Sequence, residues 1–594
     1  MSGAPRSEPA GTWQPHLGSG SVSDDLIARA IEVVEWTEIA TQVEVWEQEG
    51  RKGPGGRPRT FPLYALLVGL VVVARLGEPV HLQRVADLLF YRLSATMRAE
   101  LGIPEPPAVG DRGRRKAMYR RVRTRFHGLL RLADPSDRPK NRRLTEDVYQ
   151  LLLRERSADR SDADRDEAYD RLLWIVNRLL EASFLMLPRR YRRRWNGSVC
   201  VDATVVPAFA RPERRALGKK GRRTRPVLRR STDPDCGYYV RSVDDRDDEL
   251  ELKGMKPPIW GYEASLVVCA HVTSRGEPEL PVLVVAMPPL HRPGAEPGRN
   301  AVRALANLRG RGHRAGRLAA DNNYSAAKAE DYQLPTRALG YELVLSYRID
   351  QLGIQGQSNG LILVEGRWYC PSMPVALINA TTDLRKDRID EETYRRRIEA
   401  RRDYEAKAKG QPDAEGHQRF LCPAAQGAPT AQCPLKPKTA AFGGRTPVEI
   451  RPTKELRERP PKCCKQETVT VPPSAGAKFF QSVPYATPEH EQVYAGLRSS
   501  VEGLNGFLKD SAFEGMAEPL RRRVRGVAAQ SILVAFQIVA GNWRKIDGFL
   551  QRMADVEVSE QRVTRTRRRS TDAIQTWLPR SSSTSSGRAP PDSP

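Results

Sequence analysis

Long hydrophobic runs are missing from this chain. The longest apolar stretch, FPLYALLVGLVVVA, begins at Phe61 and ends after 14 residues, where Arg75 follows. Because a membrane-spanning helix needs about 20 apolar residues, the stretch predicts a buried helix, and we expect no membrane partner. The first 20 residues also lack the apolar segment of a signal peptide.

Cysteine is scarce, with 8 residues in 594. Such a content excludes the disulfide framework of a small secreted protein, so we expect a reducing, cytoplasmic location. A group of cysteines lies between residues 422 and 464, with His417 nearby: Cys422, Cys433, Cys463 and Cys464. Zinc ligands usually include a pair two to four residues apart. Because no pair here has that spacing, free thiols are favoured and a structural zinc ion is the alternative.

Acidic residues are outnumbered by basic ones. The chain has 72 Asp and Glu against 97 Lys and Arg, a formal net charge of +25. This excess predicts a polyanionic partner, and double-stranded DNA fits best, which adds association with the nucleoid to the expected location. Two basic runs carry the arginines that we expect to contact phosphates, Arg120 and Arg121 in residues 113–126, and Arg222 and Arg223 in residues 211–230.

Composition divides the chain into segments. Residues 1–20 are rich in Gly, Ser and Pro, which predicts a disordered tail. Residues 21–195 show helical periodicity, with a first helix capped by Ser23, and we interpret them as an all-α DNA-binding region. Residues 555–594 are basic and rich in Ser, which predicts a second disordered tail.

Two carboxylates interrupt apolar segments that read as buried strands. Asp202 lies within SVCVDATVV, and Asp321 ends the short run GRLAAD before Asn322, Asn323 and Tyr324. Ligands of α/β proteins bind at the carboxyl ends of strands, so these two acids are candidate site residues.

A helix predicted over residues 491–509 carries two parallel stripes. One stripe is apolar and predicts burial: Val493, Leu497, Val501, Leu504 and Leu508. The other is polar and runs beside it: Tyr494, Arg498, Glu502, Asn505 and Lys509. Pairing of Arg498 with Glu502 along the helix is the structural alternative, and it contributes only about 0.2–0.5 kcal/mol.

Together, Asp202, Asp321 and Glu502 supply hard oxygen ligands from two strands and one helix. Convergent carboxylates need a cation, and oxygen ligands favour Mg²⁺ or Mn²⁺. Two such ions about 3.5–4 Å apart would serve displacement at phosphorus, which indicates phosphodiester chemistry.

In this order the three acids resemble the DDE triad of bacterial insertion-sequence transposases with a ribonuclease-H-like core. The helix is similar to the tyrosine, arginine, glutamate, lysine signature of the branch that carries a β-rich insertion before its Glu. Arg498, Glu502 and Lys509 keep the family spacing, whereas Tyr494 stands one residue further from Arg498 than usual. The resemblance extends from about residue 60 to about residue 550.

The resemblance implies a division of the α/β part of the chain. Residues 196–350 would be the first part of the ribonuclease-H-like core, residues 351–490 the mixed β-rich insertion, and residues 491–554 the second part of the core with the Glu helix. The strand pattern agrees, because three consecutive strands are followed by alternating helix and strand. The predicted strands include residues 199–206, 260–272, 280–288, 316–321 and 340–348, and the predicted helices are 299–312 and 326–334.

The function implied is metal-dependent cleavage at transposon ends and strand transfer into target DNA. Asp202, Asp321 and Glu502 would hold two Mg²⁺ (or Mn²⁺) ions, Arg498 and Lys509 would contact phosphates, and Tyr494 would lie beside them. A homodimer would pair the two ends. The alternatives are an inactive relative that only binds DNA and a stand-alone nuclease on the same core.

Overall fold

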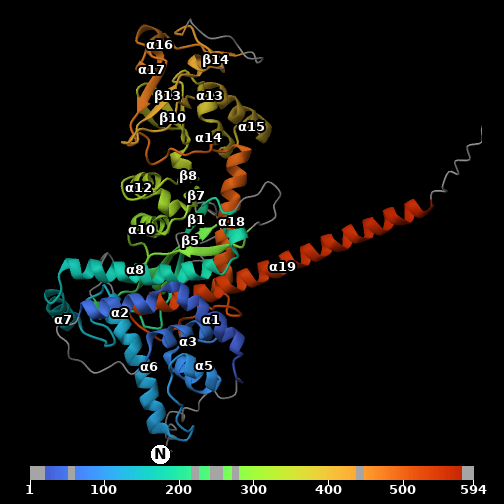
Figure 1. Ribbon diagram of the computed structural model, residues 1–594. Coiled ribbons are helices and arrows are strands. Elements are labelled where there is room, and N and C mark those ends of the chain that lie inside the picture. Colours follow the sequence, from blue (N-terminus) through green and yellow to red (C-terminus); the bar gives the residue numbers. More distant parts are fainter. Residues whose placement is uncertain are drawn as a thin grey trace, which may run out of the picture. The chain divides into compact units, whose positions relative to one another are not determined.

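The computed structural model describes residues 20–50, 61–215, 227–240, 258–270, 280–427, 429–436 and 447–577. The structure is mixed α/β, with N-terminal helices and a mixed sheet, which confirms the coarse fold class (Figure 1). The chain forms two compact units, Met1–Trp543 and Arg544–Pro594. In the described ranges, no helix has both the length and the apolar character that crossing a membrane requires.

The N-terminal region is built from helices joined by loops, with no strand among its described residues before Val199. Ser23 caps the first helix, as predicted, and its hydroxyl accepts a hydrogen bond from the N–H of Leu26. The apolar stretch after Phe61 forms a buried helix, which confirms that prediction. The elements are α1 (Asp24–Thr37), α2 (Ile39–Glu49), α3 (Leu63–Arg75), α4 (Leu82–Asp87), η1 (Leu88–Arg92), α5 (Ala95–Glu100), α6 (Arg112–Ala133), α7 (Glu146–Ala158), α8 (Asp162–Leu185) and α9 (Arg189–Arg192).

A six-stranded sheet follows these helices. Its strands are β1 (Val199–Pro207), β4 (Gly237–Tyr239), β5 (Ile259–Cys269), β6 (Leu283–Ala286), β7 (Arg317–Ala320) and β8 (Glu342–Val344). The order is β4-β5-β1-β7-β8, and β6 also pairs with β5. β1 is antiparallel to β5 and parallel to β7, and β7 is parallel to β8. The five predicted strands are confirmed, and β4, with the short pair β2 (Arg214–Arg215) and β3 (Val227–Arg229), was not predicted.

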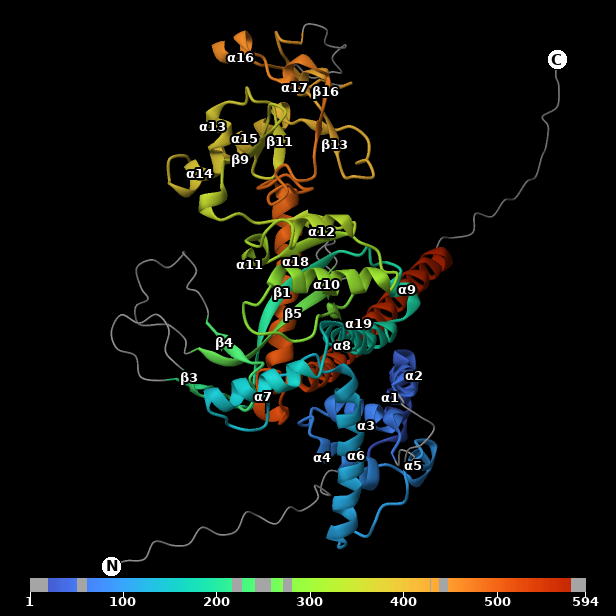
Figure 2. The same cartoon turned by 90° about the vertical axis from the view of Figure 1, so that its left-hand side faces the viewer.

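Helices cover both faces of this sheet. Figures 1 and 2 show α10 (Pro297–Gly310) on one side and α18 (Pro488–Lys509) on the other. The single helix predicted over residues 326–334 is wrong, because turns occupy most of it between α11 (Asn322–Ser325) and α12 (Gln333–Ala338). The segment instead folds around Tyr332, which is fully buried and lies against Gly298 of α10. Tertiary packing here overrides helix propensity.

The insertion between β8 and α18 is built from short strands and short helices. The strands β10 (Leu361–Val364) and β11 (Arg367–Tyr369) form a hairpin, and β16 (Thr468–Val471) lies near the end of the insertion. Its other strands are β9 (Ile354–Ser358), β12 (Lys407–Ala408), β13 (Gln418–Leu421), β14 (Ala431–Gln432) and β15 (Val448–Glu449). Its helices are η2 (Ile349–Gln351), α13 (Val375–Ile378), α14 (Ala380–Arg385), α15 (Glu391–Ala400), η3 (Arg401–Tyr404), η4 (Pro423–Ala425), α16 (Lys454–Glu458) and α17 (Lys462–Lys465).

The two ends of the insertion meet at the edge strand of the sheet. The N–H of Ser482 donates to the carbonyl of Leu343 at 3.2 Å, and Gln481 Oε1 accepts from the N–H of Leu345 at 2.8 Å. His490, in the first turn of α18, contacts the carbonyl of Leu345 through Nε2 at 2.9 Å. The chain therefore leaves the sheet and returns to it at the same place.

After α18 the chain forms η5 (Pro519–Arg521) and α19 (Val527–Trp577). In the first part of α19, the residues from Ala528 to Ala540 are all buried. α19 continues past residue 555, where the sequence pattern places the start of the C-terminal tail.

Candidate active site

Asp202 and Asp321 are neighbours on adjacent parallel strands. Val201 of β1 pairs with Ala320, the last residue of β7, so the next residue of each strand is one of the two acids. Asp321 thus lies at the carboxyl end of its strand, as expected. Asp202 lies in the middle of β1, because β1 continues to Pro207 beyond the end of β7.

α18 packs on the face of the sheet that carries Asp202. All five residues of the predicted apolar stripe are buried, and they share one core with Cys200 and Leu266 of the sheet. The hydroxyl of Thr487 caps the helix by accepting from the N–H of His490 at 3.3 Å. Because the polar stripe lies next to the buried one, it runs along the edge where Asp202 and Asp321 meet.

Arg498 joins the acids of the sheet to the acid of the helix. Its Nη1 lies 3.2 Å from Asp202 Oδ1, and its Nη2 lies 3.1 Å from Glu502 Oε1. The side chain of Arg498 is 17% exposed and that of Asp202 14%, whereas that of Glu502 is 62% exposed. The guanidinium is thus held at one end by a half-buried acid, and at the other end it pairs with an exposed one.

Negative charge exceeds positive charge at this edge. Burial raises the pKa of Asp202, the nearby charge of Asp321 raises it further, and Arg498 opposes both. Burial alone would lower the pKa of Arg498, but Asp202 and Asp321 raise it above its usual value. One guanidinium therefore faces more than one carboxylate, which is the electrostatic setting of a cation-binding site.

Asn505 belongs to the site, although it was not among the predicted site residues. Its Nδ2 donates to Asp202 Oδ2 at 2.8 Å, so each oxygen of Asp202 has a partner on α18. Asn505 is buried, and its Oδ1 makes no hydrogen bond. Its place in the polar stripe, one turn after Glu502, was the signal that would have identified it.

Tyr494, which was predicted to lie at the site, and Tyr324, which follows Asp321, have different positions. Tyr494 is half-buried one turn before Arg498 and stacks on His490 with ring centroids 5.7 Å apart. Burial raises the pKa of Tyr494 to about 12, and the charge of Asp321 acts in the same direction. Tyr324 is instead fully buried, and its hydroxyl donates to Ser265 Oγ at 3.1 Å. Tyr494 therefore lies at the site and Tyr324 supports the core.

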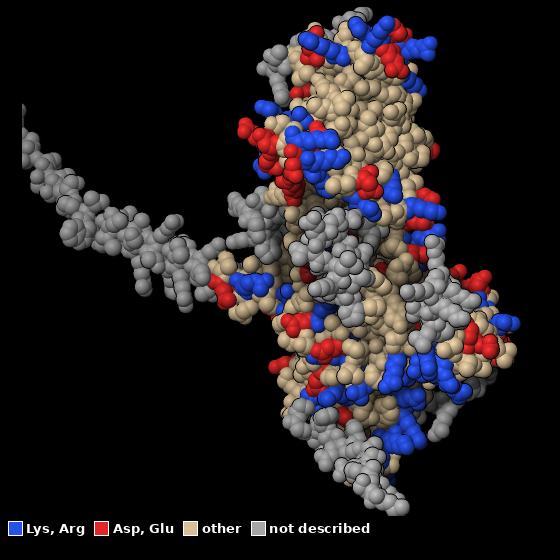
Figure 3. Space-filling model, turned by 180° about the vertical axis from the view of Figure 1, so that it is seen from behind, with Lys and Arg blue, Asp and Glu red and all other residues tan. Residues whose placement is uncertain are grey.

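The predicted DNA-contacting residues fall in several places. Lys509 ends α18, about 10 Å along the helix axis from Glu502, and is half-buried. On α6, Arg120 is exposed and Arg121 is half-buried. Arg115, on the same helix, is buried. Figure 3 shows Lys and Arg side chains gathered at the level of α6. Arg222 and Arg223 lie outside the described residues.

The donor chemistry of the three acids suits the expected ions, since Mg²⁺ and Mn²⁺ prefer carboxylate oxygens. Their oxygens do not all lie within 4.8 Å of one another, because Arg498 lies between Asp202 and Glu502. Ion binding here thus requires the guanidinium to turn away. Among the described residues, ligand atoms within 4.8 Å of one another occur in a group on the β12–β13 hairpin, Asp413, Glu415 and His417. That group is largely exposed, and such groups are common without an ion.

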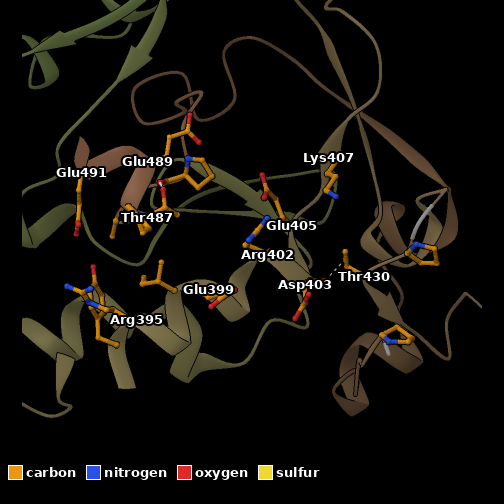
Figure 4. Close-up of a pocket in the computed structure, with 17 residues that line it drawn as sticks. Arg395, Glu399, Arg402, Asp403, Glu405, Lys407, Thr430, Thr487, Glu489 and Glu491 are labelled. Atoms are coloured by element: carbon orange, nitrogen blue, oxygen red, sulfur yellow. Dashed lines mark hydrogen bonds between the residues drawn. The ribbon is translucent and has the colours of Figure 1, made fainter. Parts of the chain in front are cut away.

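A cavity of about 870 Å³ lies apart from the acids, between α15, η3 and the first turn of α18 (Figure 4). Carboxylates outnumber cations in its lining, which contains Glu399, Asp403, Glu405, Glu489 and Glu491 beside Arg395, Arg402 and Lys407. This balance disfavours a phosphate ligand. We therefore assign the candidate active site to the edge formed by β1, β7 and α18.

Comparison with family models, curated proteins and solved structures gives no match to this chain, so its function rests on the chemistry of this edge.

Proposed function

We propose that this protein is a DNA transposase of the DDE type, with a ribonuclease-H-like core. One observation carries the proposal: the parallel register of β1 and β7 brings Asp202 beside Asp321, and α18 adds Glu502 and Arg498 at the same edge. The strand arrangement supports the core assignment. Two antiparallel neighbours, β5 and β6, extend one side of β1, and parallel strands β7 and β8 extend the other.

Asp202, Asp321 and Glu502 would hold two Mg²⁺ ions. When bound, such ions activate the attacking oxygen and offset the charge that develops on the phosphate. Asn505 keeps Asp202 in place through its 2.8 Å hydrogen bond, so the carboxylate does not need to find its orientation in each cycle.

The reaction would consist of two displacements at phosphorus. Water first attacks a phosphodiester at the transposon end, the bond to the 3′-oxygen breaks, and a free 3′-hydroxyl and a 5′-phosphate result. The 3′-hydroxyl then attacks a phosphodiester of the target, and the target's own 3′-oxygen leaves. No covalent bond to the protein and no nucleotide are needed, which agrees with a site made of carboxylates and one guanidinium.

Arg498 would change partners during this cycle. Without metal ions it pairs with both Asp202 and Glu502, at 3.2 and 3.1 Å. Once other cations neutralise these acids, the guanidinium is available to a DNA phosphate, which it binds with two parallel hydrogen bonds. DNA binding and ion binding would therefore favour each other.

The experiment that tests this function uses a labelled duplex built from the DNA that flanks the gene. We expect wild-type protein to cut one strand at the end and join it to target DNA with Mg²⁺, and to do neither with EDTA. Asp202→Asn and Glu502→Gln should each lower cleavage at least about a thousandfold, or about 4 kcal/mol, while DNA binding persists. Cleavage at the wild-type rate by either variant would remove that acid from the site.

A second candidate is a DNA-binding relative without catalytic activity. The position of Arg498 between the acids favours it, because the guanidinium offsets part of their charge and separates Asp202 from Glu502. This candidate predicts salt-sensitive DNA binding and no cleavage with Mg²⁺ or Mn²⁺. A stand-alone nuclease would differ from both, because it would cut the duplex without joining the freed end to target DNA.

A further inference from the structure

Five of the eight cysteines lie in the insertion: Cys370, Cys422, Cys433, Cys463 and Cys464. Their spacing in sequence argues against zinc, because no two of them form a pair two to four residues apart. Spacing along the chain tests only for ligands that come from one loop. The structure brings together thiols from four separate segments.

Three of these cysteines occupy the same local turn. Cys370, Cys422 and Cys433 are each followed by proline, and no other cysteine of the chain is. In each turn the carbonyl of the cysteine accepts a hydrogen bond from the N–H three residues later, at 3.0, 2.9 and 2.9 Å respectively. Proline suits the second position of such a turn, since its φ is already fixed.

The same turn directs a second N–H toward each sulfur. Burial raises the pKa of the Cys370, Cys422 and Cys433 thiols, and a hydrogen bond from the backbone N–H two residues later opposes this rise. The donors are Ser372, Ala424 and Leu435. An N–H aimed at sulfur stabilises the thiolate, which is the form that binds a metal ion.

The three turns converge with Cys464. Cys370, Cys422 and Cys433 belong to one hydrophobic cluster, and Leu435 packs against both this cluster and the one that holds Cys464. The N–H of Cys422 donates at 3.1 Å to the carbonyl of Glu467, a residue that lies three positions after Cys464. All pairs among the four thiols are close enough for the charge of one to affect another.

Lys436 supplies a positive charge to the same place. Its Nζ donates to the carbonyl of Gln466 at 2.6 Å, and its charge favours the thiolate forms of Cys422, Cys433 and Cys464. Four thiolates around one divalent cation carry a net charge of about −2, so a nearby lysine lowers the free energy of the charged site.

Cys463 lies beside these thiols. It packs in the same cluster as Cys464, and the two Sγ atoms are 4.0 Å apart. Its Sγ would also lie 2.9 Å from a Cβ placed at Gly360, in the turn between β9 and β10. We select Cys464 as the fourth ligand because the charge of Lys436 favours its thiolate form, and replacement of Cys463 tests this choice between two adjacent thiols.

We propose that Cys370, Cys422, Cys433 and Cys464 form a structural Zn²⁺ site. Tetrahedral Zn²⁺ with bonds of about 2.3 Å to sulfur places the sulfurs about 3.8 Å apart. No three of these thiols lie within 4.8 Å of one another, so the ion would draw them together by rotation of their side chains. The site would join the end of β11, the end of β13, the segment after β14 and α17, which are otherwise connected by short ladders.

This site is independent of the proposed catalytic function. The test is metal analysis of the purified full-length protein, with about one zinc ion per chain expected after gel filtration. Cys422→Ser and Cys433→Ser should lose the ion, whereas Cys463→Ser should keep it. On wild-type protein, blocking thiols with a mercurial should release about one zinc ion per chain to a colorimetric chelator. Replacement of zinc by Co²⁺ should give the intense visible absorption of a tetrahedral thiolate complex.

Wild-type protein that contains no zinc and gives no such Co²⁺ absorption would overturn the proposal. Loss of zinc in Cys463→Ser but not in Cys433→Ser would overturn the ligand assignment. A disulfide among the four cysteines in protein purified under reducing conditions would also contradict it. The mercurial and Co²⁺ measurements use the unchanged chain, so they decide the question even where a variant does not fold.

Discussion

Two arginines of this chain pair with carboxylates, one in the buried interior of the insertion and the other at a partly exposed edge of the sheet. In the insertion, Arg401 lies 2.6 Å from Glu365, and their side chains are 3% and 0% exposed. At the edge of the sheet, Arg498 bridges Asp202 and Glu502, and the side chain of Glu502 is 62% exposed. Both arginines are held by hydrogen bonds, so geometry alone does not separate a structural ion pair from a functional one.

The two sites differ in how well hydrogen bonds and opposite charges match the arginine and its carboxylates. Arg401 also donates to the carbonyls of Leu377 and Ile378, and Glu365 accepts from the hydroxyl of Thr381. One positive charge matches one negative charge. Arg498 instead faces Asp202 and Glu502 with Asp321 nearby, and this excess of carboxylates needs a further cation. A balanced buried pair stabilises the fold, whereas an unbalanced one at an exposed edge is suited to bind a ligand.

The largest effect on stability is expected at the balanced pair. Arg401→Ala leaves the charge of Glu365 buried without its partner, and we expect the insertion to lose about 3–5 kcal/mol of stability. Denaturant unfolding of the full-length protein, followed by limited proteolysis of the insertion, measures this loss. Arg395→Ala is the matched control, because Arg395 and Glu391 form an exposed pair on α15 whose removal should leave the stability almost unchanged. Equal effects of the two variants would contradict the distinction.

A buried carboxylate that an arginine does not hold should show a strong pH dependence. Asp233 accepts from the hydroxyl of Tyr262 at 2.6 Å and from the N–H of Gly526 at 3.1 Å. Burial raises the pKa of Asp233 from 3.8 to about 6. The folded protein thus binds this proton more tightly than the unfolded chain does. The contribution to stability is full below about pH 4 and is lost as the pH rises through about 6.

Asp233→Asn removes this titration. Relative to wild type, the variant should gain up to about 3 kcal/mol of stability between pH 4 and pH 7, because the wild-type carboxylate becomes charged over that range. Denaturant midpoints of both proteins at the two pH values measure the gain. The same stability difference at both pH values would show that Asp233 does not titrate there.

The smallest effect is expected at the unbalanced pair, and it concerns binding rather than folding. Arg498→Ala should weaken binding to transposon-end DNA about tenfold, or about 1.4 kcal/mol. It should also lower the slope of log affinity against log salt concentration by the amount expected for about one phosphate contact. Titration of labelled duplex at several salt concentrations measures both. Arg498→Lys keeps the charge and should retain part of the affinity. Unchanged binding by the alanine variant would argue against a phosphate role.

The elements of the sheet were predictable because their pattern is local. Each of the five strands is an apolar run, and the stripes of α18 follow from helical spacing. The helix expected over residues 326–334 failed because the burial of Tyr332 against α10 is a tertiary contact that periodicity does not report.

The components of the candidate site were predictable to different degrees. Asp202 and Asp321 were predicted because each interrupts or ends an apolar run, and Glu502 was predicted because it lies in the polar stripe of its helix. Their mutual position depends on strand register, which emerges only in the folded sheet. Asn505 was visible in the polar stripe but had no assigned partner until Asp202 was placed beside it.

The return of the insertion to the strand that it leaves makes this part of the chain a module. Hydrogen bonds join Ser482 to Leu343 and His490 to Leu345. The first and last residues of the insertion therefore lie next to each other at the end of β8. The position of Glu502 then depends on the start of α18, which is anchored to the sheet, and not on the length or sequence of the insertion. Evolution can exchange or resize such a module without realigning the acids.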